Sequence, residues 1–102
     1  MTERDKTALR ITNQFRSKGS MFYELRCDGT RLTIAVSETP RGEWRVLAHV
    51  GSADAESIEK SALTRRDALR AVGDSWATRE SPEFPTFDWN AVADALQAVR
   101  AL

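Results

Sequence analysis

The stretch that decides the fold is Met21-Phe-Tyr-Glu-Leu-Arg-Cys-Asp-Gly-Thr-Arg-Leu-Thr-Ile-Ala-Val36. It contains two runs of alternating apolar and polar residues separated by Asp28-Gly29. This pair is typical of a two-residue hairpin turn, because both central positions of a type I′ turn need positive φ. Such a turn pairs Leu25 with Leu32 and collects the large aliphatic side chains on one face. The other face then carries Phe22, Glu24, Arg26, Arg31, Thr33 and Ala35.

Further strands are predicted on both sides of this hairpin. Thr39-Pro40-Arg41-Gly42 indicates a turn, and residues 43–50 alternate as a strand with Arg45, Leu47 and His49 on the open side. A connection of three or five residues would keep the apolar residues in phase, so we expect a bulged turn. Residues 8–15 are predicted as a strand that leads into a Lys18-Gly19 turn, with a short helix as the alternative. Residues 51–63 leave a loop, a helical turn and an edge strand open.

Two helices are expected after the strands. Thr64-Arg-Arg-Asp67 fits a capping box, and the apolar spacing after it predicts a helix that ends near Thr78. Gly73 weakens this helix, and we expect it to allow close approach to a strand. Prolines at 82 and 85 interrupt the chain, and Thr86 or Asp88 caps a second helix with the apolar stripe Trp89, Val92, Leu96 and Val99.

The predicted fold class is α+β: an antiparallel meander of three to four strands followed by two C-terminal helices packed on one sheet face. Residues 1–102 form a single domain in this interpretation, with residues 1–6 disordered. The expected core consists of Tyr23, Leu25, Leu32, Ile34, Trp44, Val46, Leu69, Val72, Trp76, Trp89, Leu96 and Val99.

The composition of the chain excludes several classes of function. The chain has 102 residues, with 15 Lys+Arg, 15 Asp+Glu, one His and one Cys, so the formal net charge is zero. One His and one Cys do not assemble a zinc site of nitrogen and sulfur ligands, and no glycine-rich phosphate loop is present, so we expect no metal and no cofactor. No apolar run reaches the length of a membrane span, and the charged start MTERDKT lacks the apolar segment of a secretory signal. We therefore expect a cytoplasmic protein without a membrane association.

The open face of the sheet supplies the candidate binding residues, which are Phe22, Arg26, Arg31, Arg45, Leu47 and His49. We expect no enzyme, because His49 is the sole conventional general base and Cys27 falls on the core side. The leading hypothesis is a small non-catalytic interaction module, homodimeric or bound to a protein partner through the exposed sheet face or edge. The alternative is a sheet that binds single-stranded nucleic acid through Arg26, Arg31, Arg45 and Phe22.

The order of a strand meander followed by a helix resembles that of coactivator-type and Whirly-type single-stranded DNA binders. The resemblance is topological, covers roughly residues 8–80 of the inferred layout, and assigns no role to any residue.

Overall fold

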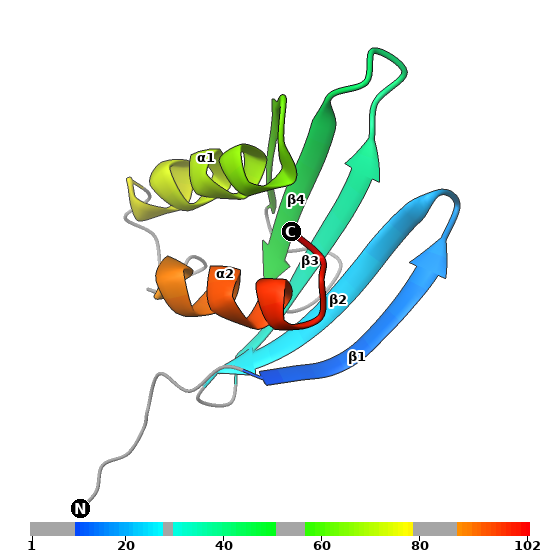
Figure 1. The fold of residues 1–102 in the computed structure, drawn as a ribbon. Coiled ribbons are helices and arrows are strands. Elements are labelled where there is room, and N and C mark those ends of the chain that lie inside the picture. Colours follow the sequence, from blue (N-terminus) through cyan, green and yellow to red (C-terminus); the bar gives the residue numbers. More distant parts are fainter. Residues whose placement is uncertain (1–9, 28–29, 51–56, 79–87) are drawn as a thin grey trace, which may run out of the picture.

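The computed structural model describes residues 10–27, 30–50, 57–78 and 88–102. In these residues, five strands form one antiparallel sheet in chain order, and two helices follow (Figure 1). The α+β class is confirmed, and the meander has five strands where three to four were predicted. The elements are β1 (Arg10–Ser17), β2 (Ser20–Cys27), β3 (Thr30–Glu38), β4 (Trp44–Val50), β5 (Ser57–Ala62), α1 (Arg65–Ala77) and α2 (Trp89–Ala98).

The central strands pair in the predicted register. In β2 and β3 the partners are Met21 with Val36, Tyr23 with Ile34, Leu25 with Leu32 and Cys27 with Thr30. The Asp28-Gly29 turn itself lies outside the described residues. Between β3 and β4, Glu38 pairs with Trp44, so the connection is five residues long and the two strands stay in phase. Within it, the N–H of Gly42 donates to the carbonyl of Thr39 (3.0 Å).

The edge strands show the structure of the two stretches for which the sequence left alternatives open. Residues 10–17 form β1, a strand rather than a helix, and it joins β2 through Lys18 and Gly19, whose φ values are 50° and 82°. Positive φ at both positions is the geometry of the predicted tight turn. The undecided stretch 51–63 contributes the edge strand β5, while residues 51–56 lie outside the described part. Residues 1–6 also lie outside it.

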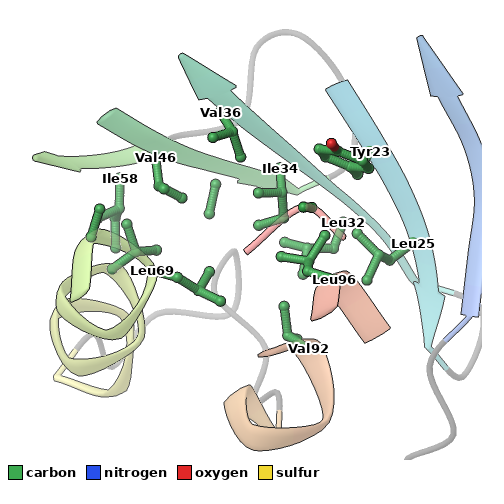
Figure 2. Packing of buried hydrophobic residues seen from close by; sticks show 14 of the residues in the cluster. Tyr23, Leu25, Leu32, Ile34, Val36, Val46, Ile58, Leu69, Val92 and Leu96 are labelled. Carbon is green, nitrogen blue, oxygen red and sulfur yellow. The ribbon is translucent and has the colours of Figure 1, made fainter. Parts of the chain in front are cut away.

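Both helices lie on the same side of the sheet (Figure 1). Helix α1 packs on β4 and β5, and α2 contacts α1 and reaches β1. Figure 2 shows Leu69 pointing toward Ile58 and Val46, and Val92 and Leu96 pointing toward the strands that carry Leu25 and Leu32. The buried set also includes Val36, Ala48, Ile58, Ala68, Val92 and Ala101, which the expected core list omits, although Val92 belongs to the apolar stripe expected for the second helix. Trp44 and Trp89 are packed against this core and are only half-buried.

The helix caps follow local chemistry. The Oγ1 of Thr64 accepts a hydrogen bond from the N–H of Asp67 (3.0 Å), and the Oδ1 of Asp88 accepts from the N–H of Asn90 (3.1 Å). Residue 86 lies outside the described part, and Asp88 holds the N-cap position.

The end of α2 corrects one core prediction. Val99 is 39% exposed instead of buried, because the helix ends at Ala98 and the chain then reverses. Arg100 has φ 62°, its N–H donates to the carbonyl of Gln97 (2.9 Å), and the N–H of Ala101 donates to the carbonyl of Leu96 (2.8 Å). This pair of bonds is a Schellman motif, and it turns Ala101 rather than Val99 into the core.

Gly73 also has a different neighbour from the one expected. A Cβ at this position would lie 3.0 Å from the Cγ of Trp89, so the close approach is to α2 and not to a strand. The glycine lets the two helices contact each other through the indole ring of Trp89.

Candidate functional site

The face of the sheet opposite the helices is organised in rows that cross the strands. Residues paired in the registers lie side by side, and alternate residues of each strand share a face. One such row is apolar from β1 to β4 and ends in a glutamate on β5: Phe15, Phe22, Ala35, Leu47 and Glu59. The predicted site residues Phe22 and Leu47 therefore belong to one row, with Ala35 between them. We call these four apolar residues the apolar row.

Phe15 extends this row to a second aromatic residue that the sequence reasoning did not include. A bulge in β1 leaves Thr12 without a paired residue in the β1–β2 register, because Ile11 pairs with Leu25 while Asn13 pairs with Glu24. The extra residue shifts the alternation, so Ile11 faces the core and Phe15 faces the open side. Strict alternation from Ile11 would have placed Phe15 on the core side.

The two phenylalanine rings stack on each other. Their centroids are 5.2 Å apart and their planes differ by 7°, while Phe15 remains 41% exposed. At this centroid separation the nearly parallel rings are stacked with a lateral offset, and they do not lie edge to edge in one plane. The pair places two stacked aromatic rings on the open face.

A second row, near the β2–β3 turn, is basic. Arg10 pairs with Arg26, and Arg26 pairs with Arg31, so three guanidinium groups project from adjacent strands. All three residues are exposed. Among the described residues, no carboxylate lies within salt-bridge distance of any of them. Like charges placed directly opposite one another destabilise a sheet, and an anion bound between them would relieve this repulsion. We call these three residues the arginine row.

The remaining predicted residues lie elsewhere on the same face. His49 is half-buried between Thr33 and Ser57, in the polar row that separates the arginine row from the apolar row. Arg45 lies beyond the apolar row, and its Nε donates to the Oε2 of Glu59 (2.8 Å). The structure thus places Arg26 and Arg31 together and keeps Arg45 apart from them, already paired. The side chain of Cys27 is outside the described part.

The basic residues at the start of α1 have partners within the protein. The guanidinium of Arg65 lies over the ring of Trp44, 4.8 Å from its centroid, and the Nη2 of Arg66 donates to the Oε1 of Gln97 (2.8 Å). These contacts give both residues a structural role in joining α1 to the sheet and to α2. They make the open face, rather than this helix end, the better candidate for an anion.

The described residues were also considered as a metal site and as membrane-spanning helices. Within the described ranges, no group of three His, Cys, Asp or Glu side chains is placed to hold a metal ion. Neither of the two described helices has the length and apolar character that a membrane crossing requires.

No family model matches the chain, and neither a curated protein nor a solved structure matches it.

Proposed function

We propose that the protein is a small non-catalytic binding module that holds a single-stranded nucleic acid on the open face of its sheet. The observation that carries the proposal is the position of the stacked Phe15–Phe22 pair on the same face as the arginine row. Guanidinium groups bind phosphates and aromatic rings stack with bases, and single-stranded binders combine these two contacts on one surface.

Other surfaces of the sheet are less suited to a partner. The opposite face is covered by α1 and α2 (Figure 1). The β1 edge contains the bulge at Thr12, and the short β5 edge carries the charged residues Glu59 and Lys60. Bulges, charges and short length are the features by which natural sheets discourage edge pairing. These features favour the open face over the edges as the binding surface.

A single strand suits this face better than a duplex. Stacked and paired bases inside a duplex do not reach a protein ring, whereas unpaired bases do. The chain has no net charge, so attraction depends on the local arginine row and should be weak. We expect a dissociation constant on the order of 1–100 µM at physiological salt, as for binding dominated by phosphate contacts.

Fluorescence anisotropy with labelled oligonucleotides tests the proposal. The probes are a thymidine 20-mer, a uridine 20-mer and a DNA duplex of the same length. Three phosphate contacts on a single strand give a log–log salt slope of about −2, so affinity should fall about 20-fold between roughly 50 and 200 mM salt. DNA and RNA single strands both offer phosphates and unpaired bases. Comparison of the thymidine and uridine strands therefore shows which of the two nucleic acids the protein prefers.

Matched variants assign the binding to the face. Arg26→Ala with Arg31→Ala should weaken binding at least about tenfold at roughly 50 mM salt and reduce the slope to about −0.7. The control is Arg41→Ala with Arg70→Ala, which removes the same charge from exposed positions off this face. Absence of binding by the wild type at low salt, or equal losses in the two double variants, would contradict the proposal.

A second copy of the chain, or another protein, is the competing occupant of the same face. The apolar row favours it, since an apolar centre with arginines at its rim is typical of protein interfaces. Light scattering decides between the two: a homodimer has twice the 11.4 kDa mass of the chain, and Phe22→Ser with Leu47→Ser should return it to the monomer mass. A dimer that is separated by these substitutions and binds no oligonucleotide would replace the nucleic-acid proposal.

A further inference from the structure

We propose that one base of the bound strand stacks on the side of Phe22 that faces β3, above Ala35, with Leu47 on its other side. This inference rests on the proposed function and assigns a single base position within it.

The position of the Phe22 ring determines which of its two faces is free to stack with a base. Phe15 covers the ring face that is directed toward β1, because the two rings face each other across the paired strands at 5.2 Å. The opposite ring face is therefore directed toward β3. The neighbour of Phe22 on β3 is Ala35. A methyl group is too short to cover an aromatic ring, so the second face of the half-buried Phe22 ring is left available for stacking.

The space above Ala35 is bounded by Phe22 on one side and by Leu47 on the other. The next residue of the row is Leu47 on β4, which is two strands away from Phe22. Two interstrand spacings amount to roughly 9–10 Å. A planar ring in van der Waals contact on both sides needs about 3.5–4.0 Å on each side, or roughly 7–8 Å in all. One base therefore fits between Phe22 and Leu47, and two do not.

The position of the arginine row sets the path of the phosphates. Arg26 lies four residues after Phe22 on β2, and Arg31 lies four residues before Ala35 on β3. Four residues of strand correspond to about 13 Å, and extended arginine side chains shorten this gap from the other end. The backbone of the strand then runs along β2 and β3, with its phosphates at the arginine row and the stacked base at the apolar row. Both contacts belong to one short segment of nucleic acid.

The experiment compares a thymidine 20-mer with an abasic strand of the same length, which keeps the phosphates and lacks the bases. Wild-type protein should bind the thymidine strand at least about fivefold more tightly, the lower end of what one stacked base contributes. Ala35→Leu fills the space beside Phe22 and should bring this ratio close to one, with affinity for the abasic strand unchanged. The control is Ala98→Leu, which adds the same bulk at an exposed position of α2 away from the open face and should keep the ratio.

The outcomes separate the inference from the proposed function. If neither strand binds, the proposed function fails. If both strands bind the wild type equally, or if Ala35→Leu keeps the full preference for bases, the stacking position is wrong while binding through phosphates stands. Thermal melting of the Ala35→Leu and Ala98→Leu variants checks the fold, and Phe22→Leu, which removes the ring and keeps an apolar side chain, should reproduce the Ala35→Leu result.

Discussion

The contact between Gly73 and Trp89 predicts how the substitution Gly73→Ala changes the free energy of unfolding. Gly73 is buried within α1, and a Cβ at this position would lie 3.0 Å from the Cγ of Trp89 and 3.2 Å from its Cβ and Cδ2. Trp89 is also held from another side, since its ring meets that of Trp76 edge-on with centroids 5.5 Å apart. A shift of the indole away from a new methyl group would therefore disturb its packing against Trp76.

Two opposing effects decide the outcome of Gly73→Ala. Alanine in a helix interior is favoured over glycine by about 1 kcal/mol. Overpacking a well-packed contact costs typically about 1–3 kcal/mol. Because Trp89 is held by Trp76, we expect the second effect to dominate and the free energy of unfolding to fall by about 1 kcal/mol.

Urea denaturation followed by circular dichroism measures this change, and a second background isolates its cause. In Trp89→Leu protein the branched side chain leaves room for the methyl group, so Gly73→Ala should there raise the free energy of unfolding by about 1 kcal/mol. A stabilisation of that size in the wild-type background would refute the reasoning, because it would show that the close contact imposes no strain. Equal effects in both backgrounds would refute it as well.

The remaining predictions concern other parts of the fold and use the same assay. Arg100→Gly should raise the free energy of unfolding by about 0.5–1 kcal/mol, because Arg100 has φ 62° and glycine adopts this conformation without strain; a loss of stability would contradict the Schellman ending of α2. Ile34→Ala should lower it by about 2–5 kcal/mol, because Ile34 is 0% exposed at the centre of the core; a loss below about 1 kcal/mol would contradict that position. Thr64→Ala should lower it by about 1 kcal/mol through loss of the cap on Asp67, and Thr64→Ser should retain the stability.

Several features of the candidate face were readable from the sequence. The Asp28-Gly29 pair and the alternation around it predict which residues of β2 and β3 face outward, and the register confirms the facing pair of Arg26 and Arg31. Signals of this kind work because a two-residue turn fixes the pairing of both strands.

The second half of the face was not readable in this way. Phe15 and Arg10 join it because of the bulge at Thr12 and the pairing of β1 with β2. The residues around Thr12 carry no glycine or other local mark of a bulge, so alternation alone predicts the wrong side for Phe15. The aromatic pair that supports the functional proposal is therefore a product of strand pairing.

The sequence by itself determined the central hairpin, the start of the first helix and the stripes that bury Leu69, Val72 and Leu96. These features depend on residues a few positions apart, whose turn, capping and periodicity preferences act locally. Only the tertiary structure decided that residues 57–62 complete the sheet as β5, that Ala101 replaces Val99 in the core, and that Gly73 receives Trp89. Each of these depends on what a distant segment brings to the same place, and local preference carries no information about that segment.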